Sequence, residues 1–240
     1  MSYLYNKKEL AFYKPKLKKL LKFSLILFFI STIFSINIIN TITARPNDDN
    51  DEILTTMLGK IDSLEREIRL IKLIQSIEFE SEIIIPDNFN ATYVEYIYNT
   101  STTLSVPIRT AFRLIYKESS FRESVTSTSG ANGLMQLMPG TRSLYYQNLR
   151  LDTLNLDRVQ EDIYIGLYML KESHTFWKQR NNSKDYSWKL SLATYNSGIA
   201  NVIKYKGIPP YKETNSFINF IQKPHSNPAL VASYLKKYKN

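Results

Sequence analysis

The sequence predicts a mainly helical protein with one globular domain of about 150 residues in its C-terminal part. Apolar residues recur at helical spacing there, and no run alternates convincingly with the period of two that marks a strand. Six of the seven glycines lie between Gly130 and Gly207. Within this set, Gly130 and Gly133 indicate either a specific backbone turn or an ordinary connection between helices.

The elements of this domain follow from the same periodicity. The polar run at 86–88 marks its entry, so the domain is expected to cover residues 86–240. Pro107 favours a helix start, because the first turn of a helix does not need its missing N–H. The ranges expected to be helical are 91–105, 107–118, 141–147, 162–180, 189–195 and 213–221.

The N-terminal region is strongly basic. Residues 1–22 hold seven lysines and one glutamate, a net charge of +6 out of +9 for the whole chain. Most of the positive charge therefore lies in an N-terminal tail, which we expect to stay in the cytoplasm. No basic motif interleaved with aromatic residues follows this tail. We expect no nucleic-acid partner.

An uncharged stretch at 23–44 follows the tail and is long enough to cross a bilayer as a helix. Lysines precede it and three aspartates follow it, which predicts a cytoplasmic N-terminus. We expect a retained transmembrane anchor. A cleaved signal sequence is the alternative, although Ile42-Thr43-Ala44 makes a poor cleavage site.

Residues 45–85 are expected to link this span to the domain. Apolar residues at 54, 57, 61, 64, 68 and 71 alternate steps of three and four, which is a heptad seam. The segment 54–71 is either a short coiled coil, through which the protein forms a homo-oligomer, or an amphipathic helix that packs on its own domain.

The chain contains no cysteine and two histidines. This excludes disulfides, a thiol nucleophile and thiolate metal sites. His174 and His225 are far apart in the sequence and are expected at the surface or in the tail. We expect neither a metal site nor a cofactor.

The candidate catalytic residue is Glu118. It lies where an apolar helical segment containing Phe112 and Ile115 gives way to polar Ser119 and Ser120. A carboxyl group at the end of a buried helix has its pKa raised by desolvation. It then stays protonated near neutral pH, as a general acid that cleaves a glycosidic bond must.

The run from Glu118 to Thr141, ESSFRESVTSTSGANGLMQLMPGT, resembles the catalytic domain of soluble lytic transglycosylases (SLT), in the lysozyme-like superfamily. Three further motifs match that family in order and spacing over about 150 residues. They are Ala193 to Gly198, Glu213-Thr214 with Phe217-Ile218, and Asp162-Ile163 with Gly166 and Leu170.

The resemblance implies a lysozyme-like fold, with a short hairpin near 124–129, and a peptidoglycan lytic transglycosylase. Glu118 would protonate the oxygen between N-acetylmuramic acid and N-acetylglucosamine, then act as base on the 6-hydroxyl and close a 1,6-anhydro ring. Glu123, the nearest acidic residue, matches a variable position. A hydrolytic muramidase and a non-catalytic peptidoglycan-binding module are the alternatives.

The resemblance also implies a set of residues that bind the glycan strand. Gln136 would bind substrate or orient Glu118, or else serve only backbone groups; Tyr195 would face the acid, and Asn196 would hold its loop more than touch sugar. Three residues depart from the family pattern: Asp162 replaces asparagine, Ser197 alanine and Phe217 tyrosine. The predicted binding set is Ser127, Gln136, Met138, Thr141, Tyr195, Asn196 and Glu213.

The substrate fixes the expected location, because peptidoglycan lies outside the cytoplasm. We expect a single-pass protein of the bacterial inner membrane with its domain on the periplasmic or wall side. Secretion after signal cleavage and association with a phage are the alternatives.

Overall fold

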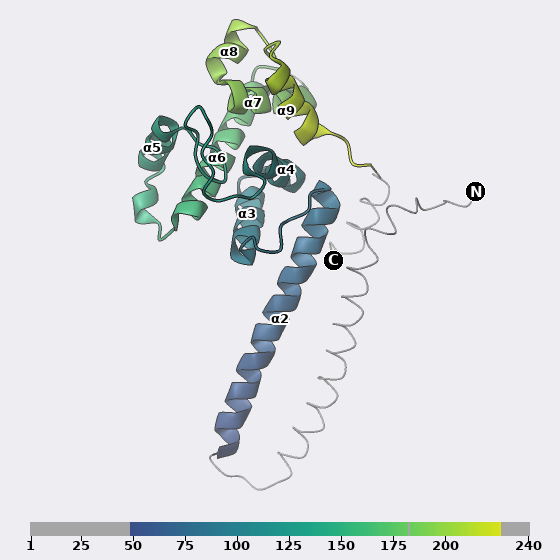
Figure 1. Ribbon diagram of the computed structural model, residues 1–240, viewed down its shortest axis with the longest axis vertical. Helices are drawn as coiled ribbons and strands as arrows, with labels where there is room; N and C mark the ends of the chain where they lie inside the picture. Colours follow the sequence, from purple (N-terminus) through teal and green to yellow (C-terminus); the bar gives the residue numbers. More distant parts are fainter. Residues whose placement is uncertain (1–48, 182, 227–240) are drawn as a thin grey trace, which may run out of the picture. The chain divides into compact units, whose positions relative to one another are not determined.

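The computed structural model describes residues 49–181 and 183–226, and over these ranges the protein is helical (Figure 1). The predicted mainly helical class is confirmed. The predicted tail at 1–22 and span at 23–44 lie outside the described residues, and within those no helix combines the length and apolarity that crossing a bilayer requires. The elements are α2 (Asp49–Ser81), α3 (Ala91–Thr103), α4 (Ile108–Ser119), α5 (Pro139–Asn148), a 3-10 turn η1 (Leu151–Thr153), α6 (Arg158–Lys178), α7 (Lys184–Ser197), α8 (Ile199–Lys204) and α9 (Lys212–Gln222).

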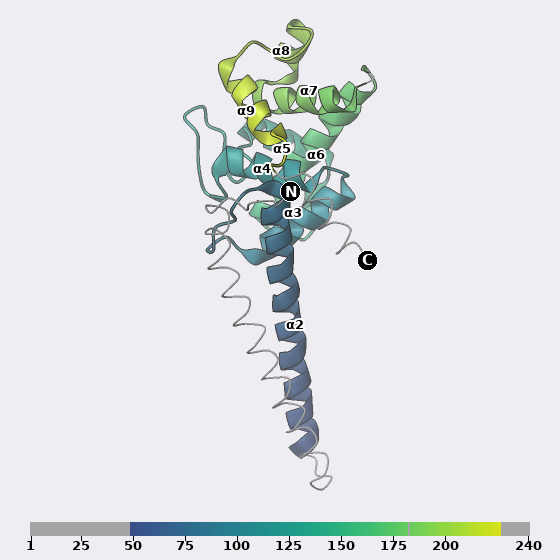
Figure 2. The same ribbon diagram turned by 90° about the vertical axis from the view of Figure 1, so that its right-hand side faces the viewer.

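The chain divides into two compact units, residues 1–65 and 66–240. The described part of the first unit is the beginning of α2, where Leu54, Leu58 and Leu64 are exposed. The predicted heptad at 54–71 is helical throughout, as part of a helix that runs on to Ser81 (Figure 2). Oligomerisation through this segment stays a prediction.

Residues before position 86 contribute to the core of the second unit. Ile77, in the last part of α2, belongs to its core, and so do Ile83 and Ile85 in the connection that follows. These side chains join the buried face of α4, which includes Phe112 and Ile115, both fully buried. A segment expected to be a linker therefore contributes to the domain core.

The central helix α4 ends abruptly. Ser120 and Phe121 both have a positive φ, at 52° and 62°, a region that non-glycine residues rarely occupy. Phe121 is held there by its ring, which packs 5.1 Å from the Phe89 ring and 6.4 Å from the Phe112 ring, measured between centroids. The turn therefore stops α4 directly after Glu118 and Ser119.

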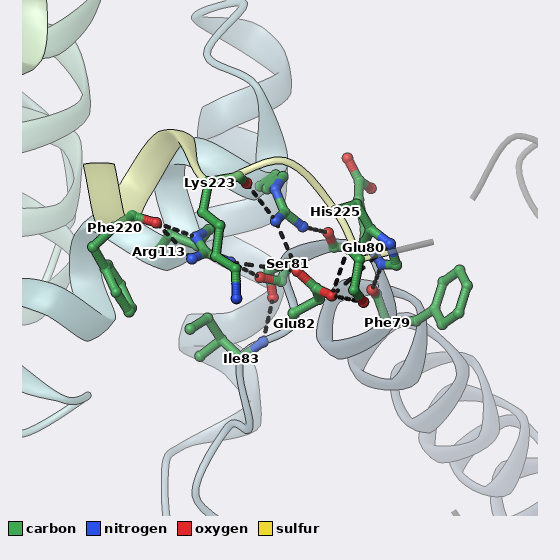
Figure 3. A network of polar contacts seen from close by, with 11 residues as sticks. Phe79, Glu80, Ser81, Glu82, Ile83, Arg113, Phe220, Lys223 and His225 are labelled. Atoms are coloured by element: carbon green, nitrogen blue, oxygen red, sulfur yellow. Dashed lines mark hydrogen bonds and ion pairs between the residues drawn. The ribbon is translucent and has the colours of Figure 1, made fainter. Parts of the chain in front are cut away.

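Buried Arg113 ties α4 to two chain segments that are distant in sequence (Figure 3). Its Nη1 donates to the Ser81 carbonyl at 2.9 Å, and its Nε donates to the Phe220 carbonyl at 2.9 Å. Neighbouring Arg109 donates to Glu82 at 2.9 Å and to the Lys223 carbonyl at 2.8 Å. The end of α2 and the end of α9 are thus fixed to the helix that carries Glu118.

The structure differs from the sequence-based expectations at several element boundaries. Helix α6 begins at Arg158 and not at 162, because Asp157 and Gln160 form a reciprocal capping box. Helix α7 begins at Lys184, where the Ser183 side chain caps it. Helix α8 was not expected, and the segment expected as a hairpin at 124–129 is a longer loop with isolated bridges between Thr126 and Asn132 and between Asn132 and Leu137.

Candidate active site

Glu118 lies in the last turn of α4 and is partly exposed. Burial raises the pKa of its carboxyl group to about 8; Lys117 opposes this shift and Glu213 adds to it. No described residue forms a hydrogen bond with the carboxyl group. Glu118 is therefore mostly protonated near neutral pH, with its proton available to a ligand.

Tyr195 on α7 is an electrostatic neighbour of Glu118. Burial raises the pKa of its phenol well above the ordinary value, and the charges of Glu118 and Asp162 raise it further. The hydroxyl donates to the Met135 carbonyl at 2.8 Å. Tyr195 therefore stays neutral, and its hydrogen bond joins α7 to the loop that follows α4. Met135, in that loop, is fully buried in the core.

Gln136 lies in that loop with a positive φ of 47°. Its side-chain Nε2 donates to the Val125 carbonyl at 3.0 Å and to the Gly133 carbonyl at 2.9 Å. The amide nitrogen thus holds the loop together, which is the backbone role that was the alternative to substrate binding. The Oε1 atom accepts no hydrogen bond from the described residues, so this oxygen can still accept one from a ligand.

Ser127 stabilises the other part of the loop. Its hydroxyl oxygen accepts a hydrogen bond from the Ala131 N–H at 3.0 Å and lies 3.1 Å from the Ser129 hydroxyl. Gly130 completes this turn with a φ of 88°. Among the described residues no hydrogen bond joins Ser127 to Glu118, so the expected role of Ser127 at the acid stays a prediction.

Asp162 on α6 is buried and forms ion pairs with two arginines. Arg142 Nε donates to its Oδ1 at 2.8 Å, and Arg158 Nε lies 3.2 Å from the same oxygen. Its Oδ2 would stand 2.6 Å from a Cβ atom added to Gly133, which has a φ of 74°. Asp162 therefore packs against the active-site loop and balances two positive charges beside it.

Sequence reasoning did not identify Arg142 or Arg158. For Arg158, the four-residue spacing to Asp162 on one helix was a usable signal. Arg142 lies on α5 and also pairs with Glu161, and no local pattern indicates that contact.

The remaining predicted residues lie on the elements around this loop. Thr214 Oγ1 donates to Asn196 Oδ1 at 2.7 Å, so Asn196 joins α7 to α9, in agreement with its expected role in holding the loop. Glu213 is exposed in the first turn of α9, next to buried Thr214. Met138, which is 46% exposed, precedes α5, and Thr141 lies half-buried in the first turn of that helix.

The structure places Glu118 close enough to Glu213 and to Tyr195 for their charges to interact. Gln136 follows Met135, whose carbonyl group accepts the hydrogen bond of Tyr195. Among the described residues no group of three or more histidine, aspartate or glutamate side chains could hold a metal ion. The arrangement offers one protonated carboxyl group at the end of α4, near a neutral phenol and the second carboxyl group of Glu213. Such a set can donate a proton to a ligand oxygen.

Residues 95–218 match the transglycosylase SLT domain family, which is more than half of the chain. The chain belongs to this family, and the identification made from the sequence motifs is confirmed.

Two solved structures are similar to parts of the chain. An inactive variant of the lytic transglycosylase Slt from Pseudomonas aeruginosa is 18% identical, with a TM-score of 0.47, over 65% of this chain and 26% of that one. The 70 kDa soluble lytic transglycosylase from Escherichia coli is 22% identical, with a TM-score of 0.44, over 62% and 25%. The chain thus spans about a quarter of the length of these proteins.

Proposed function

We propose that the protein is a peptidoglycan lytic transglycosylase that cleaves the β-1,4 bond between N-acetylmuramic acid and N-acetylglucosamine. The observation that supports this most is the carboxyl group of Glu118, whose pKa is raised to about 8 in a domain of the SLT family. A glycosidic bond breaks slowly without an acid, because its leaving oxygen must receive a proton. Glu118 would supply that proton near neutral pH.

The proposed reaction proceeds in two steps and consumes no water. Glu118 gives its proton to the bridging oxygen as the bond between that oxygen and C1 of the muramic acid breaks. The carboxylate so formed then takes the proton of the 6-hydroxyl, and O6 bonds to C1 to close a 1,6-anhydro ring. Glu118 ends the cycle protonated, and Tyr195 and Gln136 would hold the surrounding groove in place.

Glu213 supports a second candidate reaction. It is the acidic residue whose charge raises the pKa of Glu118, so the two carboxyl groups are close enough to interact. A muramidase uses such a second carboxylate to activate water or to attack C1. Replacement of Glu213 by Gln distinguishes the two reactions, because it should abolish hydrolysis but only reduce transglycosylation.

The test of catalysis is the release of soluble fragments from purified sacculi by the full-length protein. Glu118→Gln should remove nearly all release, whereas Glu123→Gln, which alters an exposed carboxylate in the following loop, should keep it. A Glu118→Gln variant with the wild-type rate would mean that another residue is the acid. Sacculus binding without any release by the wild-type protein would instead indicate the non-catalytic binding module.

We also propose a membrane-anchored topology, with residues 1–22 in the cytoplasm, 23–44 across the inner membrane and Arg45 onward on the wall side. The basic tail resists translocation, and the uncharged span is long enough for the hydrocarbon core. N-terminal sequencing of membrane and soluble fractions tests this. A soluble mature chain that begins near Arg45 would show a cleaved signal sequence.

The heptad at 54–71 would then be a stalk through which copies of the chain associate. Leu54 and Leu64, two exposed residues of this seam, support the proposal, because an apolar seam is stabilised by a partner helix. Sedimentation analysis should give an oligomer for the wild type and a monomer for Leu64→Glu. Wild-type protein that sediments as a monomer would contradict the stalk proposal.

A further inference from the structure

The second unit contains a cavity of about 730 Å³ that is separate from the candidate active site. Its wall is formed by the connection between α3 and α4, the second half of α6 and the first half of α7. Its lining includes Lys171, His174, Lys178, Lys184 and Trp188.

The cavity lies at the opposite end of the helices that carry the active site. Pro107, which lines the cavity, directly precedes the first residue of α4. Glu118 lies ten residues after that first residue, about 15 Å along the helix. Helix α7 contributes Trp188 to the cavity and Tyr195 to the active site. Helix α6 contributes Lys178 to the cavity, whereas its Gly166 lies next to Tyr195. A ligand in the cavity would therefore not occupy the glycan-cleaving site.

The wall of the cavity is positively charged. Lys171, Lys178 and Lys184 line it, and no aspartate or glutamate does. Among the described residues none of the three lysines has a carboxylate partner, although the Lys171 ammonium lies 5.5 Å from the centroid of the Tyr168 ring. Lysines that converge on one cavity repel each other, and an anion in the cavity would relieve that repulsion.

The remaining wall suits an organic ligand better than a simple ion. The His174 ring stacks on Trp188, with centroids 3.8 Å apart and planes 10° from parallel. Burial lowers the pKa of His174, and Lys178 and Lys184 lower it further, so the ring is a neutral surface near neutral pH. Its Nε2 atom is buried without a hydrogen-bond partner among the described residues.

We infer that this cavity binds a short acidic peptide. Its volume is within the range of about 300–1,000 Å³ typical of small-ligand sites and far exceeds one phosphate or carboxylate group. The separated lysines would bind carboxylates, while Leu104, Pro107 and Trp188 offer apolar contacts to the carbon chain. The hydroxyl and amide groups of Ser105 and Gln179 would bind peptide groups. This inference does not depend on the proposed glycan-cleaving activity.

Calorimetric titration of the full-length protein with the peptide Ala-Glu-Glu-Ala, carrying a free C-terminus, tests the inference. We expect saturable binding of one peptide per chain that weakens as salt is added, because charge pairs of exposed lysines are screened. The matched probe is the amidated peptide Ala-Gln-Gln-Ala, which has nearly the same shape but none of the three negative charges. Equal affinity for both peptides, or no binding of the acidic one, would overturn the inference.

Two variants locate the site. The double change Lys178→Gln and Lys184→Gln should weaken peptide binding by about fivefold or more, since two exposed charge pairs are lost. Lys189→Gln is the matched control, because Lys189 is exposed on the same helix as Lys184 but does not line the cavity. Equal weakening by the control would place the peptide elsewhere on the surface. Inorganic phosphate should compete poorly, and affinity equal to that of the peptide would contradict a peptide ligand.

Discussion

Gly166 on α6 lies so close to Tyr195 on α7 that a Cβ atom on the glycine would stand 3.0 Å from the tyrosine hydroxyl oxygen. The same Cβ would stand 2.5 Å from Cε and 3.0 Å from Cγ of Met135. The missing side chain therefore lets α6 approach the tyrosine and the loop carbonyl that it binds. This contact sets the position of Tyr195 beside the candidate acid.

Replacement of Gly166 by Ala should displace Tyr195 and Met135. We expect the free energy of unfolding to fall by about 1–3 kcal/mol, as for other overpacked cores, and sacculus digestion to slow. Gly59→Ala is the control: Gly59 lies in α2 with no atom within 4 Å of an added Cβ, so the change should stabilise by up to about 1 kcal/mol. Urea denaturation measures both, and equal effects would refute the close-packing argument.

Replacement of Asp162 by Asn tests the ion-pair cluster behind the active-site loop. The amide keeps the size of the side chain but leaves Arg142 and Arg158 with less compensating charge. Stability should fall by about 1–3 kcal/mol, because a partly buried cation loses its partner. Asp185→Asn, at an exposed position on α7, should cost less than about 1 kcal/mol. Unchanged stability of the Asp162 variant would mean that Glu161 suffices for Arg142.

Arg113→Met should detach the ends of α2 and α9 from α4. Methionine fills similar space but leaves the Ser81 and Phe220 carbonyl groups without their donor. We expect a loss of about 2–4 kcal/mol, from two unsatisfied carbonyl groups. Arg66→Met, at an exposed position on α2, should change stability by less than about 0.5 kcal/mol. Thermal unfolding of the two variants compares their stabilities. Similar melting temperatures would show that the hydrogen bonds from Arg113 to Ser81 and Phe220 do not stabilise the fold.

The raised pKa of Glu118 also predicts how stability depends on pH. Between about pH 4.5 and about pH 8 the folded protein keeps this proton, whereas the unfolded chain releases it. The folded state therefore binds more protons over that window, and its stability falls as pH rises through it. Above about pH 8 the acid is ionised, so glycan cleavage should also decline.

Glu118→Gln should remove this part of the pH dependence. The variant should exceed the wild type in free energy of unfolding by about 1–3 kcal/mol near neutral pH, and the two should converge below about pH 4.5. Urea denaturation at several pH values measures the difference, with Glu123→Gln as the control. Parallel pH profiles for wild type and the Glu118 variant would show that burial does not raise this pKa.

The sequence predicted the helices well where they were long and periodic. It missed α8, whose six residues are too few for periodicity and which Gly198, with a φ of 84°, separates from α7. It did not show that Ile77 belongs to the domain core, because Ile77 looks in the sequence like one more apolar position of a surface helix. Only the fold shows that this face meets the core.

The candidate acid could be predicted because its motif and its place at the end of an apolar helix are both local features. The role of Gln136 could not, since its Nε2 binds the carbonyl groups of Val125 and Gly133 only after the loop has closed with Gln136 at a positive φ. The burial of Arg113 was equally hidden, because its partners lie 32 and 107 residues away.

The central claim is that Glu118 donates a proton and then takes one from the 6-hydroxyl of the sugar, without water. The most direct measurement is mass spectrometry of the fragments that the full-length protein releases from purified sacculi in isotopically labelled water. The account predicts 1,6-anhydro ends, one water lighter than hydrated ends and free of label, and their loss with Glu118→Gln. Labelled, reducible ends as the sole product would contradict it and identify a muramidase.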